Sequence, residues 1–373
     1  MAKLSYAELK SVIASVVTEA KISNASFVET RNNVVGLLDK IGKIYTLDTS
    51  YAVDKLNFMD GEFLGEGKTI EEYQEDLTLP SGYDSTGANA LAPNDPTYRP
   101  VFYSYTLGRD KIKTTIRNNN IERAVNNQGQ FESIVAMQLK RLEDSYFAVK
   151  YQLKREMLAK LIDLCEGEMD YSSATAVASI SSSTAVGTII KNGTTNIGIL
   201  VKAYSSGTKD WATQTANGCI VELHLVEELD VPVDSTSGED FLVAVKKDVE
   251  KARDLSEGNS LNGNSLGAYE GLVLIVKQGI MPEIDTKTLA GAFHLEKVAI
   301  PVEVVVVKDF ASNNTDVFAI LMDNRGAKLH DTYYALRENF NGDGDFLNLF
   351  RHYEMTATIS RNTFVKVYKK ASA

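Results

Sequence analysis

The stretch that decides the fold is FESIVAMQLKRLEDSYFAVKYQLKREMLAKLIDLC, residues 131–165, because its apolar positions recur every three or four residues without a break. These positions are Phe131, Val135, Leu139, Leu142, Tyr146, Val149, Leu153, Met157, Leu161 and Leu164. Such spacing predicts one amphipathic helix with a single apolar face. Asn127 with Gln130 can cap its beginning, and Gly167 can end it.

The length of this helix sets it apart from the helices of ordinary globular chains. About 35 residues at a rise of 1.5 Å give roughly 50 Å. A compact globule of this chain length would have a radius of gyration of only about 21 Å. We therefore expect the helix to reach across the molecule, which suits a thin plate that becomes stable by tiling with copies of itself.

A second long element is predicted near the end of the chain, over residues 347–360. Its apolar residues alternate, with Leu347, Leu349, Tyr353, Met355, Ala357 and Ile359 on one face. About 14 residues at 3.3 Å give roughly 46 Å, whereas ordinary strands have about 3–10 residues. We expect the preceding NGDGD, residues 341–345, to form a tight turn, and residues 364–368 to return as the hairpin partner.

The remaining patterns predict mixed helix and strand. Residues 172–195 are rich in Ser, Thr, Ala and Gly and are typical of a linker or mobile loop. Helices are expected over residues 4–20, 26–43, 196–203, 241–254 and 284–295, and strands over 219–226, 271–277, 302–307 and 317–321. The chain is therefore expected to be an α+β protein.

Residues 55–118 carry an unusual distribution of charge. The first half is acidic, with Glu62, Glu66, Glu71, Glu72, Glu75, Asp76 and Asp84. The second half is basic, with Arg99, Arg109, Lys111, Lys113, Arg117 and, just beyond, Arg123. Alternation over residues 101–107 predicts a strand, so we interpret the whole stretch as one protruding two-stranded excursion.

A long exposed ribbon has little stability alone and needs a surface to lie on. Limbs of opposite charge on neighbouring copies would supply register and steering. We expect contacts between subunits from Glu71, Glu72, Arg109, Lys111 and Lys113. A solvated hairpin without such contacts is the simpler alternative.

Composition narrows the classes of partner and chemistry. The 373 residues carry a formal net charge of −11, which disfavours a broad basic surface for nucleic acid. Cys165 and Cys219 are the only cysteines, too few for a disulfide framework or a four-thiolate zinc site. The N-terminal residues lack the pattern of a signal peptide, and no apolar run is long enough for a membrane span.

No motif predicts catalysis, a cofactor or a metal. Gly67-Lys68-Thr69 resembles the end of a phosphate-binding loop, but Glu62 occupies the position of the required earlier glycine. The four histidines are not at metal-ligand spacing from one another. We therefore expect no catalytic, cofactor-binding or metal-binding residues.

The order of these elements, a helical N-terminal arm, an extended loop, a very long helix, an α/β region and a long returning strand, resembles the capsid fold of phage Hong Kong 97. Local sequences agree: GKTIEE at residues 67–72, FESIV at 131–135 and IDTKTLAGAFHL at 284–295 are similar to capsid proteins of small short-tailed phages with protein-primed replication. The resemblance covers roughly residues 60–165 and 270–368.

This resemblance implies an N-terminal arm over residues 1–50, an E-loop over 51–118, a peripheral domain with the spine helix over 119–185, an axial domain over 186–325, and a return to the peripheral domain over 326–373. It also implies a structural subunit of a virion, made in the host cytoplasm. Hexamers and pentamers of the chain would form an icosahedral shell. Its partners would be a scaffolding protein, a portal protein and packaged double-stranded DNA bound without sequence specificity.

Two other functions fit the same patterns. An encapsulin-like compartment protein would share the fold and would need a groove for cargo peptides. An α/β enzyme with a long regulatory helix would be a discrete monomer or dimer with a polar pocket. A phage tail protein fits less well, because such proteins are mostly β and the long helix argues against them.

Overall fold

The computed structural model describes most of the chain from Asp54 onward. The described residues are 54–65, 69–75, 98–103, 108–117, 128–194, 196–254, 259–263, 270–284, 300–310 and 315–371. The expected helices over 4–20 and 26–43 lie outside these ranges, as do residues 66–68 and all but Ile284 of the expected helix over 284–295.

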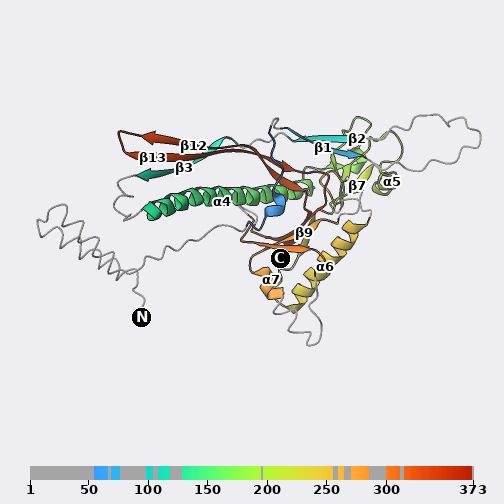
Figure 1. Ribbon diagram of the computed structural model, residues 1–373. Coiled ribbons are helices and arrows are strands. Elements are labelled where there is room, and N and C mark those ends of the chain that lie inside the picture. The colour runs from blue at the N-terminus through green and yellow to red at the C-terminus, as the bar shows by residue number, and fades with distance from the viewer. Residues whose placement is uncertain are drawn as a thin grey trace, which may run out of the picture. The chain divides into compact units, whose positions relative to one another are not determined.

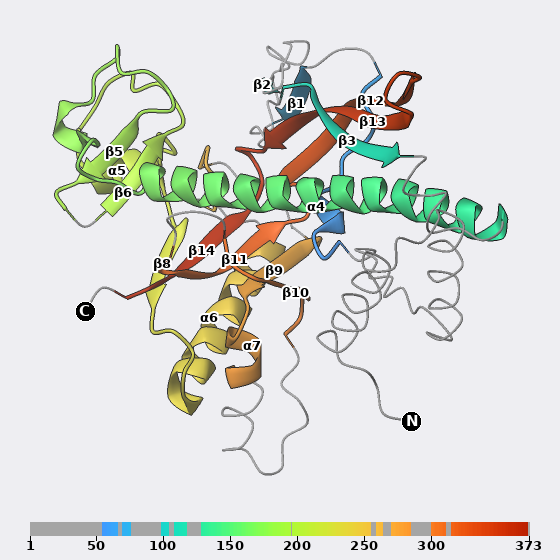
Figure 2. The same cartoon turned by 90° about the vertical axis from the view of Figure 1, so that its left-hand side faces the viewer.

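The expected long helix is confirmed as α4, Gln128–Glu168, which runs unbroken for 41 residues. At 1.5 Å per residue it is about 60 Å long. Its first half lies beside the strands of one sheet and its second half enters the main core, as two perpendicular views show (Figures 1 and 2). One helix therefore joins two packed regions of the molecule.

The sheet beside the first half of α4 is antiparallel, with strand order β12-β13-β3. Its strands are β12 (Ala327–Asn341), β13 (Phe346–Ile359) and β3 (Asp110–Arg117). The long strand expected over 347–360 is thus confirmed as β13. The turn at 341–345 is also confirmed, since the Asn341 side-chain oxygen accepts hydrogen bonds from the backbone N–H groups of Asp343 and Gly344 at 3.1 and 3.0 Å.

The expected hairpin partner of β13 was wrong. Of residues 364–368, all but Phe364 belong to β14 (Val365–Lys370), which pairs with β11 and β8 in another sheet. The partner of β13 is β12. A β-bulge between Asp331 and Tyr333 interrupts the side-chain alternation of β12, which concealed this 15-residue strand in the sequence.

The main core lies around a mixed five-stranded sheet of order β10-β9-β11-β14-β8. The strands are β10 (Glu303–Val307), β9 (Leu272–Lys277), β11 (Val317–Asp323), β14 and β8 (Val226–Leu229). Every residue of β11 is buried, as expected for a central strand covered on both faces. The strands expected over 271–277, 302–307 and 317–321 are confirmed.

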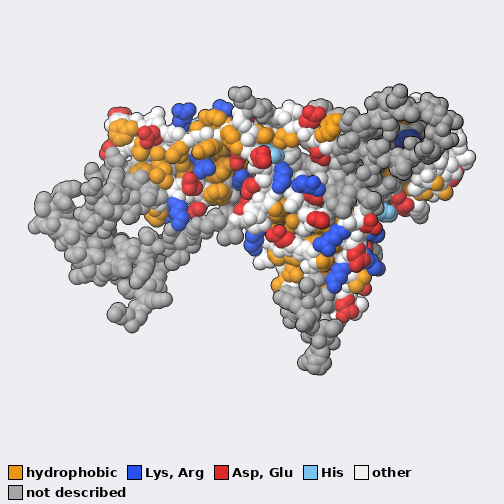
Figure 3. Space-filling model, turned by 45° about the vertical axis from the view of Figure 1, so that its right-hand side comes forward, with side chains coloured by type: hydrophobic (Ala, Val, Ile, Leu, Met, Phe, Trp, Pro, Cys, Tyr) orange, Lys and Arg blue, Asp and Glu red, His pale blue; other side chains and the backbone are white. Residues whose placement is uncertain are grey.

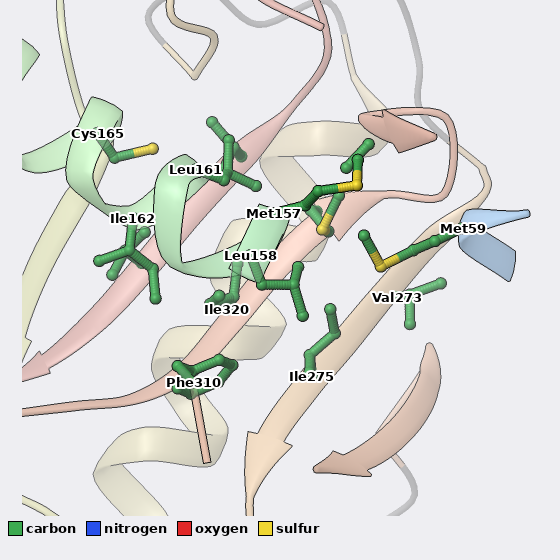
Figure 4. Packing of buried hydrophobic residues seen from close by; sticks show 14 of the residues in the cluster. Met59, Met157, Leu158, Leu161, Ile162, Cys165, Val273, Ile275, Phe310 and Ile320 are labelled. Atoms are coloured by element: carbon green, nitrogen blue, oxygen red, sulfur yellow. The ribbon is translucent and has the colours of Figure 1, made fainter. Parts of the chain in front are cut away.

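Two helices supply side chains to the two faces of this sheet. Leu158, Leu161 and Ile162 of α4 pack with Ile275 and Ile320 in one cluster (Figure 4). On the other face lies α6 (Ser235–Arg253), which confirms the helix expected over 241–254 but begins six residues earlier. Asp234 sets that beginning, because its carboxylate accepts a hydrogen bond from the Ser237 N–H at 2.8 Å. The short helix α7 (Ile280–Glu283) follows β9.

A smaller sheet of order β4-β5-β6-β7 corrects three expectations. Its strands are β4 (Thr175–Ala176), β5 (Ile189–Asn192), β6 (Asn196–Leu200) and β7 (Ile220–Glu222), accompanied by η2 (Val177–Ser179) and α5 (Trp211–Ala216). The described part of 172–195 is therefore packed structure, with Ile180 and Ile190 fully buried. Where a helix was expected over 196–203, residues 196–200 form a strand. The single strand expected over 219–226 divides between β7 and β8.

The chain changes sheet between β7 and β8, which explains that division. The Leu223 N–H donates to the Ile197 carbonyl in the smaller sheet, and the Leu225 carbonyl accepts from the Val367 N–H of the five-stranded sheet. Residues 219–226 thus contribute to two sheets, through β7 to the smaller one and through β8 to the five-stranded one.

A two-stranded antiparallel ribbon joins β1 (Ile70–Glu75) and β2 (Tyr98–Tyr103). The expected two-stranded excursion is confirmed for these residues. The prediction that the basic residues after β2 belong to the same excursion was wrong, because residues 110–117 form β3, which pairs with β13. Before the ribbon, η1 (Asn57–Met59) packs Met59 into the main core (Figure 4).

Gly198 in β6 allows the smaller sheet to pack closely. A Cβ there would lie 2.6 Å from the Val221 carbonyl oxygen and 2.9 Å from the Trp211 ring.

We predict that Gly198→Ala lowers the free energy of unfolding by about 1–3 kcal/mol, through overpacking against rigid backbone. Urea unfolding measures the change. Gly167→Ala is the control, because nothing lies within 4 Å of its added Cβ and alanine favours the helix; an equal loss in both variants would contradict the prediction.

Candidate interaction site

The outer face of the three-stranded sheet, the face away from α4, gathers basic side chains. Along β3 the inward residues include Ile116, which is buried against Leu349, and the alternate residues are exposed. The exposed side chains are Lys111, Lys113 and Arg117 of β3, with Arg109 just before it. Arg109, Lys111 and Lys113 follow one another at every second residue, about 7 Å apart, and Arg117 lies four residues farther along the same row.

Contacts with aromatic rings hold this row in place while leaving its charges accessible. The Arg109 guanidinium lies 4.1 Å from the centre of the Tyr333 ring, and its Nε donates to Glu354 at 3.2 Å. The Arg109 side chain nevertheless remains 57% exposed. The ammonium groups of Lys111 and Lys113 lie 5.8 and 5.6 Å from the centre of the Phe350 ring. Such contacts contribute about 0.5–1 kcal/mol each at exposed sites.

Neighbouring strands add to this surface in a way that the sequence did not reveal. Register pairs His352 with Lys111 and places Arg337 opposite Phe350. Both residues therefore share the outer face with the basic row, although they are more than two hundred positions away in the chain. No local sequence pattern indicates this association, because only strand pairing produces it.

The expected acidic partners lie on the ribbon and away from the basic row. Glu71 is exposed on β1. Glu72 is used within the chain, because its carboxylate accepts hydrogen bonds from the Ser360 hydroxyl at 2.7 Å and the Asn362 amide at 3.0 Å. The structure therefore brings Arg109, Lys111 and Lys113 together and does not bring Glu71 or Glu72 to them within one chain.

A cluster of charged side chains connects this sheet to α4 and to the segment that precedes the ribbon. The Lys154 ammonium group, fully buried, donates to Asp54 and lies 3.0 Å from Asp60. Lys150, one turn earlier, lies 2.8 Å from Asp60 and 3.0 Å from Asp331 of β12. We call Asp54, Asp60, Lys150, Lys154 and Asp331 the charged cluster.

The pKa shifts in and beside this cluster have identifiable causes. Burial by itself raises the pKa of Asp60, but hydrogen bonds and charges from Lys150 and Lys154 outweigh it and hold the pKa below its ordinary value. Burial lowers the pKa of Lys150, and Asp60 with Asp331 raises it above its ordinary value. Tyr146 donates to Asp331 at 2.5 Å, and its pKa is raised first by burial and then by that carboxylate.

Metal ligation, thiol reactivity and membrane crossing can each be judged within the described ranges. Within them no three His, Cys, Asp or Glu side chains are placed to hold a metal ion. Cys165 and Cys219 are buried, and burial raises the pKa of the Cys165 thiol, which disfavours the reactive thiolate. None of the helices in these ranges is long and apolar enough to cross a membrane.

Comparisons with known proteins agree with this architecture. The chain matches the family model of the Phi29-like phage major capsid protein over residues 5–365. The major capsid protein of Bacillus phage PZA is 23% identical over 343 residues, which cover 88% of this chain and 61% of that protein. The chain thus spans about three fifths of the length of this curated relative.

Solved phage capsid structures share the fold, as two examples show. A chain of the Staphylococcus phage Andhra capsid structure has a TM-score of 0.55 at 13% identity, covering 88% of both chains. A chain of the cyanophage P-SCSP1u capsid structure has a TM-score of 0.51 at 9% identity, covering 89% of this chain and 92% of that one. The expected α+β capsid fold is confirmed by this likeness.

We predict that Lys154→Met lowers the free energy of unfolding by about 2–3 kcal/mol. Breaking a fully buried pair costs roughly 3–5 kcal/mol, and water reaching Asp60 reduces this loss. The matched control is Lys160→Met on the same helix, where the side chain is 75% exposed and its ion pair contributes less than about 0.5 kcal/mol. Urea unfolding of both variants measures the difference; equal losses would contradict a special role for Lys154.

The charged cluster also predicts a dependence on pH. A carboxylate with a lowered pKa stabilises the fold above its unfolded pKa, ordinarily 3.8, and this contribution disappears as pH falls through the lower folded value. Asp60→Asn should therefore lower the urea midpoint at pH 7, with the deficit shrinking below about pH 4. A deficit that stays constant from pH 7 to pH 3 would show that the charge of Asp60 is not the cause.

Proposed function

Because the chain belongs to the family of Phi29-like phage major capsid proteins, we propose that it is a structural subunit of an icosahedral shell and not an enzyme. The observation that carries the proposal is α4. Its 41 residues hold the three-stranded sheet and the main core on one continuous support. A subunit that tiles a shell needs its contact surfaces held in fixed positions on such a support.

We propose the following assignment of domains. Residues 1–50 form the N-terminal arm, and the ribbon of β1 and β2 belongs to the E-loop. The peripheral domain contains α4 and the three-stranded sheet, so β3 moves into it from the originally expected E-loop of 51–118. The axial domain contains the five-stranded and four-stranded sheets, and it takes in β14 from the expected 326–373 segment.

The partners follow from this role. Copies of the chain would form hexamers and pentamers of one closed shell in the virion. Assembly in the host cytoplasm would involve a scaffolding protein and a portal protein, and the shell would enclose double-stranded DNA. A formal net charge of −11 supports enclosure without tight binding, because phosphate and carboxylate groups repel each other.

We further propose that the basic row of Arg109, Lys111 and Lys113 contacts the acidic ribbon of a neighbouring copy. The row is exposed and fixed by Tyr333 and Phe350, and Glu71 is exposed on the ribbon. Since Glu72 already binds Ser360 and Asn362, its role is to anchor the base of the ribbon. Many such weak contacts, repeated around a closed shell, give a strong assembly.

Reversal of charge tests this contact. Lys111→Glu with Lys113→Glu should reduce the yield of shells by at least about tenfold, because like charges then face each other in every copy. Adding Glu71→Lys should restore part of the yield. Shells are counted by sedimentation and negative-stain microscopy of the chain expressed with its neighbouring genes.

The control for overall charge is Lys202→Glu with Lys247→Glu, which changes the net charge equally at exposed positions outside the sheet. The contact is contradicted if the control loses as many shells as the Lys111 and Lys113 variant, or if that variant assembles normally. A wild-type chain that forms no shells at all would contradict the proposed function itself.

A further inference from the structure

A polar connection runs from the β1–β2 ribbon into the rest of the subunit. Glu72 of β1 accepts hydrogen bonds from the Ser360 hydroxyl at 2.7 Å and from the Asn362 side-chain amide at 3.0 Å. Ser360 and Asn362 are only 8% and 5% exposed, and they lie between the end of β13 and the start of β14. The ribbon is therefore attached where the chain passes from the three-stranded sheet to the five-stranded sheet.

The series of hydrogen bonds continues away from the ribbon. The Asn262 Nδ2 donates to the Asn362 Oδ1 at 2.6 Å, and the Asn262 Oδ1 accepts from the Arg361 Nε at 3.2 Å. A second nitrogen of Arg361 donates to the Glu168 carboxylate at 2.6 Å. Because Glu168 is the last residue of α4, the series connects the ribbon to the end of the long helix.

The groups at the two ends of the series fix the orientation of both asparagine amides. Arg361 can only donate and the ionised Glu72 can only accept, whereas each asparagine side chain does both. All three bonds run from the cation to the anion, so turning over the Asn262 amide would place two donors and two acceptors against each other. Aligned bonds of this kind polarise and strengthen one another in a protein interior. The series therefore has one favourable arrangement.

Segment 259–263, which supplies the middle of the series, is packed against two sheets. The Asn259 carbonyl accepts a backbone hydrogen bond from β14 at 2.9 Å, and Leu261 is fully buried in the main core. A Cβ on Gly263 would lie 2.3 Å from the Ile199 side chain of β6, so the backbone approaches the smaller sheet closely. A shift of the smaller sheet or of β14 would therefore move this segment.

Charges around these residues are paired within the subunit. In Figure 3 acidic and basic side chains lie next to one another over the middle of the visible face. Lys369 of β14 bonds Glu166 of α4 at 2.8 Å, two residues before the Glu168 that binds Arg361. Since Arg361 meets its opposite charge inside one chain, the series of bonds forms without a second copy.

We propose that Glu72, Asn362, Asn262 and Arg361 form a latch that holds the ribbon in one direction on the free subunit, under the control of segment 259–263. Displacing this segment separates Asn262 from Asn362, which removes the support that directs the Asn362 amide at Glu72 and so releases the ribbon. A ribbon already held in one direction loses less conformational freedom when it contacts a neighbouring copy. The latch goes beyond that contact, because it is a property of the single chain and forms whether or not a shell does.

The distance between the ribbon and α4, measured by electron paramagnetic resonance on the dissociated chain, tests the latch. Spin labels are attached at Tyr73→Cys on the ribbon, where Tyr73 is 58% exposed, and at Lys160→Cys on α4, where the side chain is 75% exposed. Cys165 and Cys219 are buried and stay unlabelled. The chain that carries only these labels should give one narrow distribution of distances. A broad distribution would show that the ribbon is not held and would overturn the proposal.

In the labelled chain, Glu72→Ala should widen the distribution at least about twofold, because the ribbon then samples several directions. Glu71→Ala is the control, since Glu71 is exposed on the same strand and should leave the width unchanged. An unchanged width in the Glu72 variant, or equal widening in both variants, overturns the latch. All of these measurements use the dissociated chain, so they are independent of whether it forms shells.

Control by segment 259–263 is tested with Asn262→Ala, because Asn262 reaches Glu72 through Asn362. This variant should widen the distribution as Glu72→Ala does, and the double variant should be no wider than Glu72→Ala alone, since both remove the same restraint. Asn348→Ala is the control, because it removes a hydrogen bond of 2.7 Å from a buried asparagine in the three-stranded sheet. Widening with Glu72→Ala but not with Asn262→Ala, or equal widening with Asn348→Ala, overturns the proposal.

Discussion

The buried ammonium group of Lys154 is the point on which the rest of the structure depends. A charge with no exposure to water is tolerated only beside opposite charge, and Asp54 and Asp60 supply it. Those carboxylates lie at the entrance to the ribbon, while Lys150 extends the same cluster to Asp331 of β12. Two segments far apart in the sequence, residues 54–60 and β12, thereby meet on α4.

The three-stranded sheet shows how one element presents two different surfaces. Its outer face carries basic side chains fixed on Tyr333 and Phe350, which suits an acidic partner. Its inner face is covered by α4 along β3 and β13 and is exposed along the far part of β12. A sheet with two unlike faces can make contacts of different kinds with different partners, without a separate binding domain.

The two faces of this sheet differ in physical character. The basic side chains Arg109, Lys111 and Lys113 act on a partner through charge, which salt screens over about 8–10 Å. The apolar side chains that β12 exposes act through buried surface, which moderate salt leaves unchanged.

The sequence alone determined the elements whose pattern is local and uninterrupted. Neighbouring residues set the apolar period of α4, the alternation of β13, the NGDGD turn and the long apolar runs of β9 and β11, so these elements were predictable. Only the tertiary structure decided the rest. Pairing between distant strands brings β3 beside β13 and β14 beside β11. Residues 196–200 form a strand because they pair within the smaller sheet. The bulge near Thr332 determines on which face of β12 Tyr334 lies. These outcomes depend on partners distant in the chain, which no local period encodes.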